Sequence, residues 1–122
     1  MSELLDASVA IDFLRGRREA LDVIDAAEDL VASEITRYEV LAGVRPGEEQ
    51  STEDLLALPA WVAVDEGIAR RAAALARQYR DACSGIEDAD YLIAATALEL
   101  DARLLTTNVK HFPMLPGLEP AY

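Results

Sequence analysis

Four polar residues of the sequence have the types needed for metal chemistry on phosphate. Three are acidic and one is an amide: Asp6, Glu39, Asp90 and Asn108. Their oxygens are hard donors, which favour Mg²⁺ or Mn²⁺ over zinc. Bare carboxylates gathered in one pocket repel one another by about 1–4 kcal/mol per pair at effective dielectric constants of 20–80, so a central divalent cation stabilises them. Such an ion can orient a phosphodiester, activate a water for in-line attack and stabilise the leaving oxygen.

These residues can meet only if the fold brings distant segments to one place. Short apolar runs predict strands over residues 4–6, 30–32, 61–64 and 103–106. Helical spacing predicts helices over residues 9–14, 18–27, 36–43, 52–58, 66–83 and 87–100. The proline-interrupted tail is expected to add a short edge strand. The alternation of strands and helices favours a mostly parallel sheet with right-handed crossovers.

The predicted fold is a single α/β domain over residues 1–122, a three-layer sandwich with a four- or five-stranded sheet between helices. Ligands of such sheets bind beyond the carboxyl ends of the strands. Asp6 ends the first strand, and Glu39 lies about one turn into the helix after the second. Asp90 lies in the first turn of the buried helix before the fourth strand, and Asn108 follows that strand. We therefore expect all four at one edge, with Asp6 and Asp90 as the most direct metal ligands.

Each of these residues also has a purely structural interpretation. Asp6 can cap the first helix, and Thr36-x-x-Glu39 spells a capping box. Asn108 can make a turn after the strand. Asp90 is harder to explain structurally, because a carboxylate beside an apolar helix needs a partner. Asp88 is expected to be the N-terminal cap of that helix, with a smaller chance of joining the acidic cluster.

Composition narrows the function classes. The 122 residues include 11 Lys and Arg against 23 Asp and Glu, a net charge of −12, which argues against a simple cationic nucleic-acid binder. The single cysteine, Cys83, excludes an intrachain disulfide, and the only histidine, His111, lacks zinc-ligand spacing to another donor. The first residues lack the pattern of a signal peptide, and no apolar run approaches the roughly 20 residues of a membrane span. A soluble, cytoplasmic protein is expected.

Three segments resemble a known family. LLDASVAIDFLRG at the start, SEITRYEVLAG in the middle and DADYLIAATALELDARLLTTNVKHF near the end resemble PIN-domain proteins. More narrowly, they resemble the VapC toxins of bacterial and archaeal toxin–antitoxin pairs, and the likeness runs from Leu4 to about Leu118. It implies a Mg²⁺- or Mn²⁺-dependent endoribonuclease that is inhibited by a VapB-like antitoxin. It also implies a homodimer, and a hetero-oligomer with the antitoxin.

The resemblance assigns site residues by position. The acids of the family fall on Asp6, Glu39 and Asp90, and its hydroxyl residue two after the first acid falls on Ser8, which implies a supporting hydrogen bond. Thr106, at the end of the fourth strand, is also expected to support the site. The fourth acidic position falls on Asn108, and another acid often seen three residues later is His111 here. The missing negative charge leaves open whether one metal binds or two.

Two other interpretations compete with a nuclease. The first is a non-catalytic interaction module whose acidic pocket binds an arginine-rich partner, since a guanidinium matches carboxylates bidentately. The second, ranked lower, is a phosphatase of the haloacid dehalogenase type, which also places an aspartate after the first strand. That family requires a second acid two residues further on, where this chain has Ser8. The identity of a target RNA is not encoded in these motifs.

Overall fold

A computed structural model describes all residues 1–122 and contains one sheet of four parallel strands in the order β3-β2-β1-β4. The strands are β1 (Glu3–Leu5), β2 (Leu30–Ser33), β3 (Ala60–Val62) and β4 (Arg103–Leu105). Leu4 of β1 lies beside Val31 of β2 on one side and Leu104 of β4 on the other. The predicted parallel α/β sheet is therefore confirmed, with four strands.

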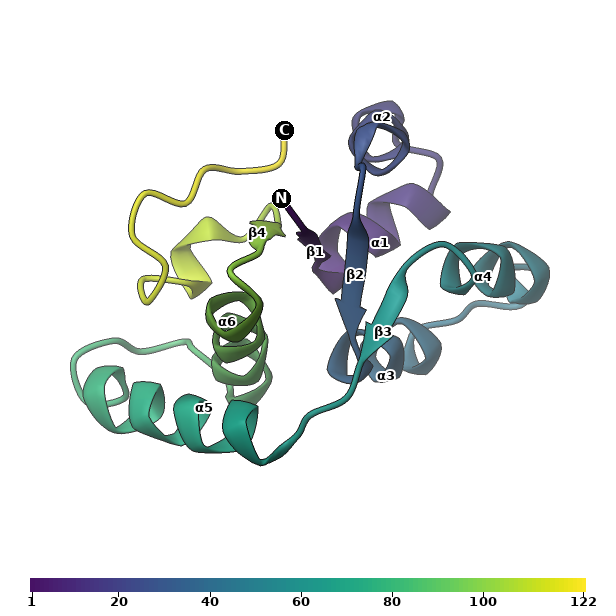
Figure 1. The fold of residues 1–122 in the computed structure, drawn as a ribbon. Helices are drawn as coiled ribbons and strands as arrows, with labels where there is room; N and C mark the ends of the chain where they lie inside the picture. The colour runs from purple at the N-terminus through teal and green to yellow at the C-terminus, as the bar shows by residue number, and fades with distance from the viewer.

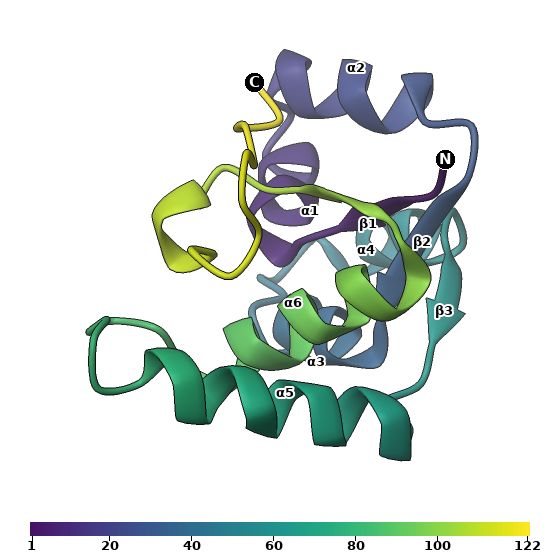
Figure 2. The ribbon, with the colours of Figure 1, turned by 60° about the vertical axis from the view of Figure 1, so that its left-hand side comes forward.

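Helices cover both faces of this sheet. They are α1 (Ala7–Leu14), α2 (Arg18–Ala26), α3 (Glu34–Ala42), α4 (Glu49–Leu56), α5 (Glu66–Tyr79) and α6 (Asp88–Leu100), with a short 3₁₀ helix η1 (Val109–His111). In Figure 1, α5 and α6 lie on one side of the strands with the C-terminal tail, while α1 to α4 lie on the other. Figure 2 shows α5 running alongside α6 as an outer layer. The strands therefore form the middle layer of a three-layer sandwich.

Alternating side chains of the short strands divide the interior into two cores. Leu4, Val31 and Leu104 pack with α5, α6 and the tail. Their sequence neighbours Leu5, Ala32 and Leu105 pack with α1, α2, α3 and α4. The alternation follows from the pleat of a strand, in which successive side chains point to opposite faces. Helix α6 carries a run of buried residues, as its apolar composition predicts.

Some element boundaries differ from the sequence-based prediction. Helix α3 begins at Glu34, because Ser33 Oγ accepts the backbone N–H of Ile35 at 3.0 Å and caps the helix there. The N-cap of α6 is Glu87, so the assignment of Asp88 as the cap was wrong. The proline-interrupted tail forms no edge strand, and its backbone meets the segment just after β4 through a hydrogen bond from the N–H of Ala121 to the carbonyl of Thr106 at 2.8 Å. No helix in the structure combines the length and the apolar content that a membrane crossing requires.

Candidate active site

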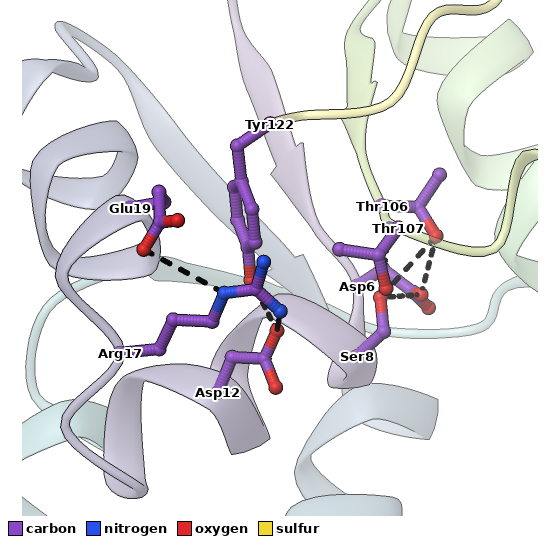
Figure 3. A network of polar contacts seen from close by, with 8 residues as sticks. All are labelled: Asp6, Ser8, Asp12, Arg17, Glu19, Thr106, Thr107 and Tyr122. Carbon is purple, nitrogen blue, oxygen red and sulfur yellow. Dashed lines mark hydrogen bonds and ion pairs between the residues drawn. The ribbon is translucent and has the colours of Figure 1, made fainter.

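Asp6 lies between the end of β1 and the start of α1, where hydrogen bonds hold both its backbone and its side chain. Its backbone N–H donates to the carbonyl of Leu105 at 3.0 Å, and the residue is 8% exposed. Its Oδ2 atom accepts hydrogen bonds from Ser8 Oγ and from Thr106 Oγ1, both at 2.8 Å (Figure 3). The side chain makes no capping bond to α1, so Asp6 is not kept there as a helix cap. Oδ1 forms no hydrogen bond and is free to meet a ligand.

The two hydroxyls that hold Asp6 are themselves oriented by backbone groups. The N–H of Thr107 donates to Ser8 Oγ at 3.1 Å, and the N–H of Asn108 donates to Thr106 Oγ1 at 3.0 Å. Each hydroxyl has a single proton, which it gives to the carboxylate of Asp6. The chain leaving β4 therefore fixes the direction of both donors, and through them the plane of the Asp6 carboxylate.

Glu39 lies on α3 and shares an electrostatic neighbourhood with the other acids. The capping-box interpretation is excluded, because Ser33 caps α3 and the hydroxyl of Thr36 donates to the carbonyl of Leu5 at 3.3 Å. The pKa of Glu39 is raised to about 7, first by burial and then by the negative charges of Asp6, Asp90 and Glu87. Carboxylates from three separate elements thus act on one another at the carboxyl edge of the sheet.

Asp90 combines a structural and an electrostatic role. Its Oδ2 accepts the backbone N–H of Glu87 at 2.9 Å, which satisfies a free donor at the start of α6. His111 Nδ1 lies 3.4 Å from the same oxygen. Burial raises the pKa of Asp90 above its usual value. The hydrogen bond from the Glu87 N–H and the charge of His111 lower this pKa, while the charges of Asp6 and Glu87 raise it further. As in Asp6, Oδ2 is engaged twice and Oδ1 has no hydrogen-bond partner.

The remaining candidates occupy different positions around this cluster. Asn108 precedes η1 with an exposed side chain that makes no hydrogen bond, and it joins the network through its backbone N–H. Asp88 is exposed and forms an ion pair with Arg80 at 3.5 Å, outside the cluster. Sequence reasoning missed Glu87 and did not associate His111 with Asp90. The one sequence signal for His111 was its place at a position where the resembling family often carries an acid.

The clustered side chains fit a divalent cation by their chemistry, although they do not form a complete ligand set. As they stand, no three acidic, histidine or cysteine side chains form a ready-made ligand set for one ion. The donor chemistry nevertheless fits: Asp6 and Asp90 each have one oxygen fixed by two contacts and one oxygen free. Burial and then the charges of Asp6 and Asp90 raise the pKa of Glu39, and a cation among the three acids relieves the repulsive part of this effect. Hard, oxygen-preferring ions such as Mg²⁺ and Mn²⁺ match this donor set.

A surface hollow of about 590 Å³ lies elsewhere, near the amino ends of β2 and β3. Its lining includes Phe13, Leu21, Ile24 and Leu58, together with Asp22 and Asp25. None of the clustered acids contributes to it. Because the chemistry-bearing groups gather at the opposite edge of the sheet, the acidic cluster rather than this hollow is the candidate active site.

Comparisons with known proteins match the fold and the length of the chain. Residues 4–115 match the family described as PIN domain. Ribonuclease VapC19 of Mycobacterium tuberculosis is 48% identical over 124 residues, which cover 98% of this chain and 99% of that protein. A toxin–antitoxin complex from Klebsiella pneumoniae contains a chain that is 32% identical, with a TM-score of 0.84 and 98% coverage of both chains. DNA-bound VapBC from Salmonella typhimurium, at 17% identity and a TM-score of 0.85 over 100% of this chain and 99% of that chain, shares the fold.

Proposed function

The chain belongs to the PIN-domain family, and from this premise we propose that it is a metal-dependent endoribonuclease, the toxin of a toxin–antitoxin pair. The observation that carries the proposal is the gathering of Asp6, Glu39 and Asp90 at one edge of the sheet, where burial first, and then the charges of Asp6 and Asp90, raise the pKa of Glu39 to about 7. Perturbed carboxylates that meet in this way are typical of sites that bind metal and move protons. The 48% identity to a protein named a ribonuclease supports RNA as the substrate.

Each residue of the site has a role in this proposal. Asp6 and Asp90 bind Mg²⁺, or Mn²⁺ in its place, through the oxygens that the protein leaves free. An ion held by these residues would supply positive charge at the scissile phosphate and would lower the pKa of a bound water. Glu39 orients the attacking water and accepts its proton, a role for which its half-buried place beside the two metal-binding acids is suited. Asn108 binds the metal or a water through its amide oxygen, while Ser8 and Thr106 fix the carboxylate of Asp6.

The proposal extends to partners. A VapB-like antitoxin is proposed as the inhibitor, because the Klebsiella pneumoniae structure that this chain resembles is a toxin–antitoxin complex. An arginine of such a partner can pair bidentately with the clustered carboxylates. Assembly as a homodimer, and as a hetero-oligomer with the antitoxin, is part of the same proposal.

The decisive experiment compares Asp6→Asn and Asp90→Asn with Asp25→Asn, which removes the same charge from an exposed position on α2. Cleavage of total cellular RNA is measured with Mg²⁺, with Mn²⁺ and with EDTA. We expect both site variants to lose about 100-fold or more in rate, a loss of roughly 2.7 kcal/mol of transition-state stabilisation, with Asp25→Asn unchanged.

Undiminished cleavage by either site variant refutes the assignment. A protein that binds an arginine-rich peptide tightly, but neither binds divalent cations nor cuts RNA, supports the non-catalytic interaction module instead. Isothermal titration with Mn²⁺ alone separates these outcomes without depending on the choice of RNA.

A further inference from the structure

The C-terminal tail returns across the molecule to the segment that holds Asp6. It is the yellow segment of Figures 1 and 2, and it leaves η1 and ends beside α1 and α2. The N–H of Ala121 donates to the carbonyl of Thr106 at 2.8 Å. Ala121 and Tyr122 pack against the same core as α1 and α2. The tail therefore contacts both the exit of β4 and the helix that begins after Asp6.

Tyr122 anchors this return. Its hydroxyl donates to Asp12 Oδ2 on α1 at 2.5 Å, and the guanidinium of Arg17 lies 4.9 Å from the centre of its ring (Figure 3). Arg17 also approaches Asp12 and Glu19, each at 3.6 Å. Burial and the bond to Asp12 raise the pKa of the Tyr122 hydroxyl, which therefore stays a donor. An aromatic ring held by a hydrogen bond, a stacked cation and apolar packing makes a defined attachment point.

Thr106 connects this anchor to the active site. Its carbonyl holds the tail, while its hydroxyl donates to Asp6 and accepts the N–H of Asn108. Thr106 is fully buried, and because both contacts belong to this one residue, the position of its backbone sets the position of its hydroxyl. A closed path of contacts thus runs from Asp6 through Thr106, the tail and Asp12, and back along α1 to Asp6.

We propose that Tyr122 is a positioning residue for Asp6: by clamping the tail to α1, it holds Thr106 where its hydroxyl fixes the Asp6 carboxylate. The inference rests on the proposed function insofar as Asp6 is a metal ligand. The positioning itself is defined by protein contacts and can be measured without metal or RNA. Mutating a residue that hydrogen-bonds to a metal ligand typically lowers metal affinity by about 10–100-fold. Tyr122 acts one contact further away, so we expect its loss to lower metal affinity by about three- to tenfold.

The test uses the full chain with Tyr122→Phe, Tyr122→Ala and the control Arg103→Ala. Arg103 pairs with Glu3 at the amino end of β4, so its loss removes one polar tie from the same strand at the opposite edge. Three quantities are measured: amide hydrogen exchange at Thr107 and Asn108, the dissociation constant of Mn²⁺ alone, and thermal stability. The two amides report on Ser8 Oγ and Thr106 Oγ1 directly.

We expect Tyr122→Ala to accelerate exchange at Thr107 and Asn108 by about tenfold relative to the other amides. The same variant should weaken Mn²⁺ binding about three- to tenfold, with a smaller effect in Tyr122→Phe, which keeps the ring. Arg103→Ala should change neither quantity. If Tyr122→Ala lowers stability but changes neither the two amides nor Mn²⁺ affinity more than Arg103→Ala does, the positioning role is overturned.

The two proposals fail in different ways. A wild-type chain that binds no Mn²⁺ overturns the metal assignment, and the exchange of the two amides then decides the positioning role alone. If Tyr122→Ala does not fold, Tyr122→Phe carries the comparison, because it removes only the hydroxyl that Asp12 accepts. Unchanged exchange at both amides in a folded Tyr122→Phe protein then overturns the role of the anchor.

Discussion

Replacing Glu39 by Gln should stabilise the metal-free protein at alkaline pH. The pKa of Glu39 rises from an ordinary value of 4.5 to about 7 because burial and neighbouring acids disfavour its charged form. At 1.36 kcal/mol per pKa unit, this difference corresponds to at most about 3 kcal/mol of destabilisation when the carboxylate is ionised. Screening by solvent reduces the expected value for a partly exposed group to about 1–2 kcal/mol.

The direction in which stability changes with pH follows from proton linkage. Between pH 4.5 and about 7 the folded state binds more protons at Glu39 than the unfolded state does, so stability falls as the pH rises. Below pH 4.5 both states are protonated and the penalty vanishes, and above about pH 7 it is complete. Glu39→Gln, which cannot ionise, should therefore match the wild type at pH 4 and exceed it by about 1–2 kcal/mol at pH 8.5.

Urea denaturation at several pH values in EDTA measures this difference. Glu28→Gln, which changes an exposed carboxylate away from the cluster, is the matched control and should show no such pH-dependent gain. Saturating Mg²⁺ should reduce the advantage of Glu39→Gln, because a cation compensates the same repulsion. If Glu39→Gln is no more stable than the wild type at pH 8.5, burial and the neighbouring acids do not disfavour the charged form of Glu39 as described.

Three further substitutions test individual contacts. Thr106→Val removes the donor to Asp6 and leaves the N–H of Asn108 without its partner, so urea denaturation should show a loss of about 1–3 kcal/mol, with Thr106→Ser close to the wild type. Tyr91→Phe removes a buried hydroxyl that has no hydrogen-bond partner, and thermal unfolding should show stability unchanged or raised by up to about 1 kcal/mol; a clear loss would contradict this. Asn108→Asp should tighten Mn²⁺ binding or raise its stoichiometry in calorimetry, and an unchanged titration would mean that this side chain does not face the ion.

The sequence predicted the parallel sheet and the edge at which the acids are expected, because both follow from the order of strands and helices along the chain. Strand ends were readable from apolar runs, and parallel strands bring their carboxyl ends together. This rule, together with the place of Asp90 in the first turn of the helix before β4, predicts that Asp6, Glu39 and Asp90 lie near one another, and the charges of Asp6 and Asp90 contribute to the raised pKa of Glu39. Their roles in binding metal and cleaving RNA stay predictions.

Features that depend on contacts between distant segments were not predictable. Thr36 matched a capping box, yet the cap of α3 depends on where β2 ends, and Ser33 occupies that position. The approach of His111 to Asp90 arises because η1 turns back over the start of α6, which no local pattern encodes. The tail was expected as a strand, but its prolines lack the N–H groups that a ladder needs, and the N–H of Ala121 donates to Thr106, beyond the end of β4.

The position of β1 between two cores has a consequence for how firmly Asp6 is held in place. Leu4 of β1 packs in one core and Leu5 packs in the other, and the residue that follows them is Asp6. Releasing that aspartate by local unfolding therefore requires opening both cores at once, so we expect its position to be among the better protected in the chain.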